Sequence, residues 1–149
     1  MTFSVFSDEH YMNEALKEAK KALDEDEVPI GAIIVCKNQI IARAYNRTEK
    51  LQDVTAHAEI QAFTAASEFL GSKYLKDCTL FVTLEPCIMC AGASYWTQLS
   101  RVVYGASDNK RGYKTLTENP FHPRTFVSGG IKKEECGQLV TEYFKRKRK

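Results

Sequence analysis

The spacing of apolar residues along the chain predicts three amphipathic helices and indicates where a fourth begins. Apolar side chains that recur every three or four residues form one buried face of a helix. This period occurs in residues 8–23, 56–70 and 132–147. Ser7 is a candidate N-cap of the first helix, and Gly71 closes the second. Pro86 suits the first position of a further helix that ends near Trp96.

Five short apolar runs predict strands, because β-branched residues are frequent in them and turn residues separate them. They cover residues 30–36, 40–45, 79–84, 101–104 and 125–128. Residues 37–39 join the first two runs, which predicts a hairpin. Residues 105–123 are rich in Gly, Pro, Asn and Lys and predict a functional loop or an irregular helix. A hairpin followed by alternating strands and helices predicts an α/β fold, with a mixed sheet and helices on both faces.

Length and composition fit one domain over residues 1–149. A chain of roughly 150 residues buries close to 70% of the surface that its unfolded form exposes, so it needs no disulfides. The 5 cysteines, an odd number, also argue against a disulfide framework. No apolar run approaches the roughly 20 residues of a membrane helix. Residues 1–10 lack the basic start and apolar block of a signal peptide, so we expect a cytoplasmic protein without a membrane anchor.

Charge is distributed unevenly along the chain. Residues 1–99 hold 9 Lys and Arg against 14 Asp and Glu, whereas residues 100–149 hold 12 against 5. The last residues, 145–149, are all basic. Such a tail can contact the phosphates of a nucleic acid, and it can equally be the solvated end of a helix whose dipole favours cations.

Two short motifs carry candidate chemistry: His-Ala-Glu at 57–59 and Pro-Cys-Ile-Met-Cys at 86–90. His and Cys are zinc ligands, and three protein ligands with one open position are the pattern of a catalytic site. Cys87 and Cys90 are three residues apart and share one helix face, where the helix dipole favours thiolates. His57 would complete the ligand set, and Glu59 would point towards a substrate instead of the metal.

Each motif also has a simpler explanation. A Cys-x-x-Cys pair alone could be a redox pair, but that would leave His57 and Glu59 without a role. A closed structural zinc site needs a fourth ligand, and the other histidines, His10 and His122, lack ligand spacing to a partner. A non-catalytic, zinc-stabilised RNA-binding subunit would have no use for Glu59 as a proton shuttle. The combination favours a hydrolytic metal site.

The combination H-x-E…P-C-x-x-C resembles the signature of zinc-dependent nucleobase deaminases. From residue 8 to residue 147 the chain is most similar to the bacterial tRNA adenosine deaminases of the cytidine/deoxycytidylate deaminase superfamily, which convert the wobble adenosine to inosine. The matching segments are EVPIGA at 27–32, YNR at 45–47, TAHAE at 55–59, VTLEPCIMCAGA at 82–93 and RVVYGA at 101–106. The resemblance implies a three-layer α/β/α cytidine-deaminase-like fold with a five-stranded mixed sheet, and one Zn²⁺ per subunit.

The resemblance also implies a mechanism. Zinc held by His57, Cys87 and Cys90 lowers the pKa of water to about 7 and so supplies a hydroxide, which attacks C6 of adenosine. Glu59 is the catalytic proton shuttle: it takes the proton of the water and delivers protons to the ring nitrogen and the leaving amine.

Contacts to the flipped base follow from the same resemblance. Val28 and Pro29 match the wall of the base pocket. Asn46 matches a residue that hydrogen-bonds the base, although it could also be a turn residue. Leu84 and Glu85 lie where backbone groups hold the base edge and the departing amine.

Contacts to the RNA outside the pocket are implied at three positions. Asp108 and Lys110 match residues that touch the RNA backbone. Phe144 matches an aromatic that packs near the anticodon loop, but it could equally be core. The chain departs from its relatives at residues 111–116, where RGYKTL replaces a Gly-Ala-rich stretch, and the agreement improves again from residue 130.

The expected partners are a tRNA anticodon loop and a second copy of the chain, with no membrane. Relatives are usually homodimers, which makes residues of the helix after the second cysteine and its end interface candidates: Ser94, Tyr95, Trp96 and Leu99. Trp96 could equally be core. The alternative substrate is a free nucleobase or nucleoside, such as guanine, cytosine or cytidine. That alternative needs a lid over the pocket, and residues 145–149 are too highly charged to pack as one.

Overall fold

The computed structural model describes residues 6–148 and contains a five-stranded mixed sheet. Its strands are β1 (Gly31–Cys36), β2 (Gln39–Tyr45), β3 (Cys78–Leu84), β4 (Arg101–Ala106) and β5 (Phe126–Gly129). They lie in the order β2-β1-β3-β4-β5. Strand β1 is antiparallel to β2 and β3, whereas β4 is parallel to β3 and β5. The predicted mixed sheet is confirmed. Two parts of the chain lie outside the described residues: residues 1–5, which belong to the segment inspected for a signal peptide, and Lys149 of the basic tail.

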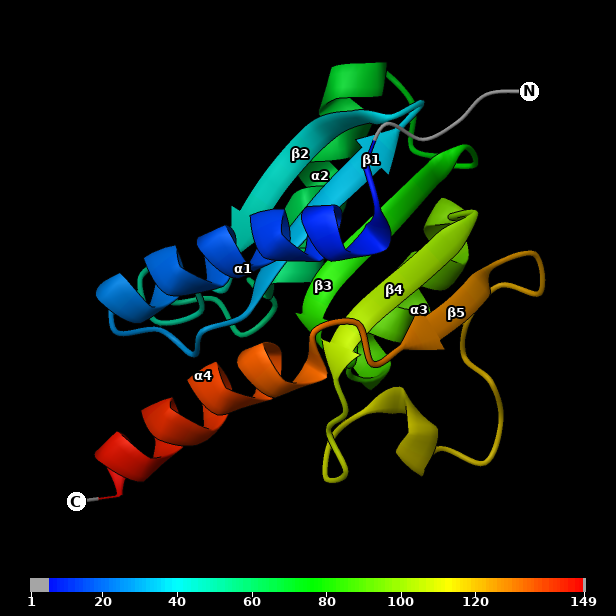
Figure 1. Cartoon of the computed structure of the whole chain (residues 1–149). Helices are drawn as coiled ribbons and strands as arrows, with labels where there is room; N and C mark the ends of the chain where they lie inside the picture. Colours follow the sequence, from blue (N-terminus) through cyan, green and yellow to red (C-terminus); the bar gives the residue numbers. More distant parts are fainter. Residues whose placement is uncertain (1–5, 149) are drawn as a thin grey trace.

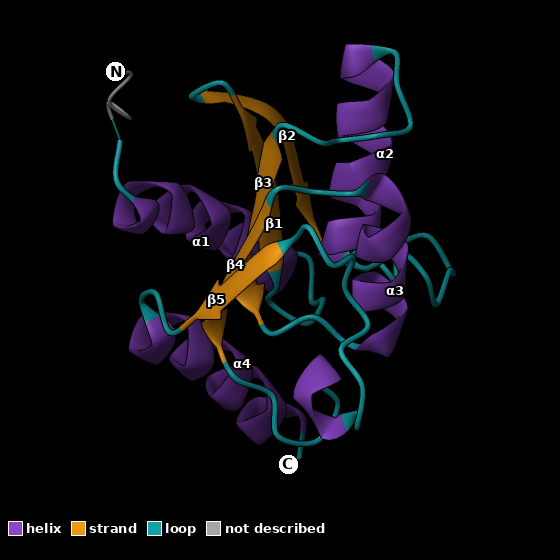
Figure 2. Ribbon diagram, turned by 90° about the vertical axis from the view of Figure 1, so that its right-hand side faces the viewer, coloured by secondary structure: helices purple, strands orange, loops and turns teal. Residues whose placement is uncertain are grey.

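Four α-helices cover the two faces of the sheet. They are α1 (Asp8–Asp24), α2 (Ala58–Leu70), α3 (Ile88–Thr97) and α4 (Lys133–Lys147). Helices α1 and α4 lie on one face, and α2 and α3 lie on the other (Figures 1 and 2). The predicted three-layer α/β/α architecture is therefore confirmed. Within residues 6–148, none of the helices has the length and apolar character that crossing a membrane requires.

The helix ends show which local signals were decisive. Ser7 caps α1 as predicted, because its hydroxyl accepts a hydrogen bond from the backbone N–H three residues on at 3.1 Å. Gly71 ends α2 in the left-handed region, with φ of 66°. Pro86 is not the first helical residue, contrary to the prediction. Cys87 keeps an extended backbone with ψ of 175° as the N-cap of α3, so the helix begins one residue later.

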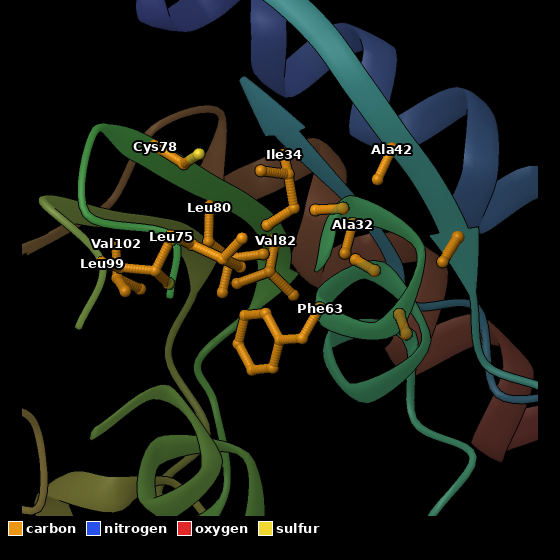
Figure 3. Packing of buried hydrophobic residues seen from close by; sticks show 14 of the residues in the cluster. Ala32, Ile34, Ala42, Phe63, Leu75, Cys78, Leu80, Val82, Leu99 and Val102 are labelled. Atoms are coloured by element: carbon orange, nitrogen blue, oxygen red, sulfur yellow. The ribbon is translucent and has the colours of Figure 1, made fainter. Parts of the chain in front are cut away.

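The apolar core has two layers, one on each face of the sheet. The layer beneath α2 and α3 includes Phe63, Leu75, Leu80, Val82, Leu99 and Val102 (Figure 3). The layer beneath α1 and α4 includes Met12, Leu16, Phe81 and Val103. Leu80 and Phe81 are neighbours in β3 and enter opposite layers, because successive strand residues face opposite sides. Two packed layers hold the strand ends in fixed positions.

The segment between β4 and β5 is irregular, as predicted, and contains one turn of 3-10 helix, η1 (Tyr113–Thr115). Its aromatic side chains fix it to the core. The rings of Tyr113 and Phe121 pack edge to face with centroids 4.8 Å apart, and Tyr113 also meets Tyr104 of β4 at 6.2 Å. Phe121 is buried. The segment between β4 and β5 is thus anchored by apolar contacts of its own.

Candidate active site

Three side chains with metal-binding atoms meet where helices α2 and α3 begin. The Nδ1 atom of His57 lies 3.7 Å from Sγ of Cys87 and 3.5 Å from Sγ of Cys90. All three ligand atoms lie within 4.8 Å of one another, and within residues 6–148 no fourth His, Cys or carboxylate belongs to this group. His57 and Cys87 are the N-cap residues of their helices, and neither side chain caps its helix. Both side chains are therefore free to face a metal ion.

The protonation of this cluster shows why it suits a cation. The pKa of Cys87 is lowered to about 4, first by the hydrogen bond from Cys90 and then by the one from His57. The pKa of Cys90 is raised by that same hydrogen bond to Cys87 and by burial. Hydrogen bonding to Cys87 also raises the pKa of His57. Metal ions bind thiolates and neutral imidazole, so a divalent cation can replace the protons that these groups share. The residues present fit a metal of the zinc type.

Glu59 lies in the first turn of α2, only 4% exposed, and is not part of the ligand group. Burial raises the pKa of its carboxyl group to about 7. A carboxyl group with a pKa near neutrality can accept a proton and return it at similar cost, which is what a general acid–base catalyst needs. The structure thus places a candidate proton carrier two residues after His57, a candidate metal ligand.

Asn46 follows β2 and is buried beside the start of α2. Its backbone N–H donates to the carbonyl oxygen of Ile30 at 3.0 Å. Among residues 6–148 its side-chain amide has no hydrogen-bond partner, although it is only 5% exposed. The amide N and O atoms of Asn46 are not among the fully buried polar atoms that lack a partner, so they remain accessible to a ligand. Pro29 is buried and Val28 half-buried in the segment before β1.

The ends of β3 and β4 hold the remaining predicted contacts near the base. Leu84 ends β3 and is half-buried, and Glu85 after it is buried. The backbone N–H of Glu85 donates to the carbonyl oxygen of Ala106 at 2.8 Å, and its carboxylate accepts a hydrogen bond from the backbone N–H of Asp108 at 3.1 Å. Asp108 is half-buried, whereas Lys110 is exposed. The side chain of Glu85 is thus occupied by the loop after β4.

Exposure decides between core and contact surface for the residues of α3 and α4 that the sequence left open, and for the interface candidates. Phe144 is 45% exposed on α4, whereas its neighbour Tyr143 is 8% exposed. Phe144 is therefore not a core residue. Trp96 is 74% exposed and Tyr95 is 38% exposed, so both can meet a partner. Ser94 and Leu99 are buried inside the chain and offer no surface to an interface, contrary to the expectation for them.

Two polar residues that were not selected from the sequence hold the backbone around the site in place through hydrogen bonds. The side-chain amide of Gln61 on α2 donates to the carbonyl oxygens of Tyr45 at 2.6 Å and Ala56 at 3.1 Å, and so ties the end of β2 to the residue before His57. Its signal in the sequence was a polar residue one helical turn after His57.

Glu27 supports the same region from the other side. It is 1% exposed, and its carboxylate accepts hydrogen bonds from the backbone N–H groups of Glu49 at 3.1 Å and Lys50 at 2.7 Å. Glu27 thereby holds the loop that connects Asn46 with His57. In the sequence Glu27 ends an acidic run at 24–27 and begins the matching segment at 27–32, but its chemical type does not show that its carboxylate is the buried one.

Comparison with known proteins gives consistent matches. The family model described as MafB19-like deaminase matches residues 6–148. The tRNA-specific adenosine deaminase of Bacillus subtilis (strain 168) is 46% identical over 147 residues, which cover 95% of this chain and 91% of that protein. The tRNA-specific adenosine deaminase of Agrobacterium fabrum (strain C58 / ATCC 33970) is 42% identical over 93% of this chain and 95% of that protein.

Solved structures agree with these matches. A structure from a study of A-to-I editing by tRNA:A34 deaminases at the wobble position of transfer RNA superposes with a TM-score of 0.80 at 42% identity, covering 87% of this chain and 98% of that one. A guanine deaminase from Nitrosomonas europaea superposes with a TM-score of 0.79 at 22% identity, covering 95% of this chain and 86% of that one. The second likeness concerns the fold alone.

Proposed function

Because this chain belongs to the family of tRNA-specific adenosine deaminases, we propose that it hydrolyses the exocyclic amine of adenosine at the wobble position of a tRNA anticodon. Water adds to C6 of the base, the C6–N bond breaks, and inosine and ammonia are the products. The observation that carries the proposal is the meeting of His57, Cys87 and Cys90 at two helix starts with the buried carboxyl group of Glu59 beside them.

The metal of this site is proposed to be one Zn²⁺ per subunit, held by His57, Cys87 and Cys90. One histidine and two cysteines are a ligand set that zinc takes in catalytic sites, and three ligands leave one position open. When bound, zinc lowers the pKa of water to about 7 and so makes water a usable nucleophile at neutral pH. The pKa of Cys87, lowered to about 4, supports this assignment, because a thiolate is the form that binds metal.

Glu59 is proposed to move the protons of the reaction. Its carboxylate takes a proton from the attacking water and passes it to N1 of the adenine ring. It then delivers the second proton of the water to the departing amine, which leaves as ammonia. A pKa near 7 supports this cycle, because neither protonation state of Glu59 is then strongly disfavoured.

The base is proposed to enter a pocket between the segment before β1 and the start of α2. Val28 and Pro29 would form its wall, and the unpartnered side-chain amide of Asn46 would hydrogen-bond the base. Backbone groups of Leu84 and Glu85 would hold the base edge and the amine. A nucleotide in a loop is easier to flip out than one in a duplex, which favours an anticodon loop as the substrate.

The outer surface is proposed to bind the RNA through Asp108 and Lys110 after β4 and through Phe144 on α4. The exposed basic end of α4 supports this, because cations there can contact phosphates. We also propose one deaminase domain over residues 1–149, a homodimer that uses the exposed Tyr95 and Trp96, and a cytoplasmic location, where an enzyme would meet mature tRNA.

A substrate comparison tests the function. The purified protein is incubated with an anticodon stem-loop that carries adenosine at position 34 and, separately, with free guanine, cytosine and adenosine. We expect inosine in the stem-loop and release of ammonia only there. Ammonia from a free base without conversion of the stem-loop would overturn the proposed substrate in favour of a free-base deaminase.

A further inference from the structure

The buried carboxylate of Glu85 makes contacts that the proposed chemistry does not use. Its Oε1 atom accepts a hydrogen bond from the backbone N–H of Asp108 at 3.1 Å, and its Oε2 atom accepts one from the backbone N–H of Lys114 at 3.1 Å. Glu85 itself is 4% exposed. Hydrogen bonds to an ionised acceptor are roughly twice as strong as neutral ones. A single side chain therefore holds both ends of the 107–114 loop, which runs from the end of β4 into η1 (Figure 1).

Backbone hydrogen bonds fix the same loop to the segment that leads into α3. The N–H of Glu85 donates to the carbonyl oxygen of Ala106 at 2.8 Å, and the N–H of Tyr113 donates to the carbonyl oxygen of Pro86 at 2.9 Å. Cys87, a metal-ligand candidate, forms an isolated β-bridge with Gly112. The loop is therefore built directly on the residues that begin the metal site.

Gly112 leaves the space that the carboxylate of Glu85 occupies. A Cβ atom at this position would overlap the carboxylate and the carbonyl oxygen of Asp108. The backbone of Gly112 is in the ordinary extended region, with φ of −68°, so the glycine is needed for space and not for its conformational freedom. This gives a second, independent way to disturb the same contact.

Within the loop, the carboxylate of Asp108 accepts hydrogen bonds from the backbone N–H groups of Lys110 and Arg111, each at 3.1 Å. The exposed ammonium group of Lys110 is thus carried on a turn whose shape depends on Asp108. The position of Asp108 depends in turn on Glu85. A chain of hydrogen bonds therefore leads from the end of β3 to a cation at the surface.

We propose that Glu85 is a positioning residue for the RNA: its carboxylate fixes the 107–114 loop so that Asp108 and Lys110 meet the strand beside the target adenosine. This inference rests on the proposed function, and it assigns the side chain of Glu85 a role in substrate affinity and not in bond breaking. Loss of the contact should therefore raise KM by a larger factor than it lowers kcat.

A double-mutant cycle with Glu85→Gln and Lys110→Ala tests the inference on the metal-loaded protein. The amide of glutamine offers one acceptor atom where two are needed, so we expect Glu85→Gln to raise KM for the stem-loop about tenfold, the effect of one lost charged hydrogen bond. Because both changes act through one loop, the double variant should show little more than the larger single effect. Multiplied effects, or a fall in kcat at constant KM, would overturn the positioning role.

Gly112→Ala is the second variant, and Gly137→Ala on α4 is its control. A Cβ at Gly137 would make only ordinary van der Waals contact, so that variant should keep the wild-type KM. Gly112→Ala should raise KM as Glu85→Gln does. Amide hydrogen exchange at Asp108 and Lys114 should also accelerate in both loop variants, and unchanged exchange together with unchanged KM would contradict the inference.

Deamination of the stem-loop by the wild-type protein is measured first, so that failure of the proposed function can be distinguished from failure of the role of Glu85. If the wild type does not deaminate the stem-loop, the proposed function fails. If the wild type converts the stem-loop while Glu85→Gln keeps wild-type KM and loop exchange, only the role of Glu85 fails. Metal content and the melting temperature of each variant are measured alongside, because a purely structural role would lower both without a selective change in KM.

Discussion

At the scale of single residues, the two candidate roles at the metal site can be separated by removing one group at a time. Glu59→Gln keeps the shape of the side chain but removes the proton acceptor. We expect the metal content to remain at one ion per chain and the turnover of the stem-loop to fall by about 10²- to 10⁴-fold, the range for loss of a general acid–base catalyst.

The matched control for this change is Glu68→Gln, an exposed glutamate on the same helix, which should keep wild-type turnover. Inosine is measured in single-turnover reactions and metal by elemental analysis. Turnover of Glu59→Gln within a few-fold of the wild type would remove Glu59 from the proton pathway.

Cys87→Ser tests the ligand assignment with a readout that does not depend on activity. The serine hydroxyl is a much weaker zinc ligand than a thiolate, so we expect the bound metal to fall well below one ion per chain and the melting temperature to drop. Cys36→Ser, at a half-buried free cysteine of β1, should keep the metal. Full metal occupancy in Cys87→Ser would mean that other groups hold the ion.

At the scale of secondary structure, Gln61 joins three elements that the site needs. Gln61→Leu removes donors from two backbone carbonyl groups at the end of β2 and before α2. We expect a loss of about 1–3 kcal/mol in the free energy of unfolding, because the carbonyl oxygen of Tyr45 loses this donor and that of Ala56 keeps only the backbone N–H of Arg47. Asn46, the proposed contact to the base, is the residue after Tyr45. Its position should therefore change as well, and KM for the stem-loop should rise.

Urea unfolding and steady-state kinetics measure the two effects of Gln61→Leu. The control is Gln138→Leu on the exposed side of α4, where a glutamine bonds only Glu142 one turn away. A Gln61→Leu protein with wild-type stability and wild-type KM would show that the start of α2 holds its position without this side chain.

The ion pair between α1 and β2 gives the fold a defined dependence on acid. The pKa of Glu14 is lowered from 4.5 to about 2, first by its hydrogen bond to Lys17 and then by the one to Arg43. A lowered pKa stabilises the folded chain above pH 4.5, and the contribution disappears as the pH falls towards 2. Since Arg43 is 39% exposed and solvent screens the pair, we expect Glu14→Gln to cost only about 1 kcal/mol at pH 7.

Unfolding curves at several pH values check this expectation. The difference between wild type and Glu14→Gln should shrink steadily from pH 5 to pH 2. Glu118→Gln, at an exposed position between β4 and β5, should show no such trend. A difference that stays constant down to pH 2 would mean that the charge of Glu14 contributes nothing.

Periodicity and local motifs predicted the elements well where one signal was decisive. The hydroxyl of Ser7 and the left-handed Gly71 set helix ends as expected. The pattern failed where long-range contacts determine the backbone: Cys87 stays extended because it bridges Gly112, so α3 begins after it. No spacing rule connects two residues that meet only after the chain has folded.

The site divides in the same way. The sequence could select four residues, because together they form the combination H-x-E…P-C-x-x-C: His57, Glu59, Cys87 and Cys90. Supporting groups such as Gln61 and Glu27 could not be selected in this way, because their importance lies in the backbone groups that they bond, and those bonds follow from tertiary structure. Exposure also separated Tyr143 from Phe144, which share one helix and one apolar pattern.

At the scale of the whole molecule, the basic end of α4 can be divided into cations that are free for RNA and one that is not. All four cations at residues 145–148 are exposed, but within residues 6–148 only Lys147 of these four forms an ion pair, with the carboxylate of Asp26 at 2.7 Å. Each phosphate contact contributes roughly 0.7–0.9 to the slope of log K against log salt concentration. Replacing the other three, Lys145, Arg146 and Arg148, by glutamine should therefore weaken stem-loop binding and flatten that slope by about 2.

Lys147→Gln is the internal comparison, because its ammonium group is already paired and should release fewer counterions on binding. Binding is measured on a Glu59→Gln background, so that the RNA is not converted during the titration. The slope should change by less than for any one of Lys145, Arg146 and Arg148, which form no such ion pair within the described residues. If the triple replacement left the slope unchanged, the basic end of α4 would be only a solvated helix terminus, and the RNA would have to be held by Lys110 and the surfaces beside the metal site.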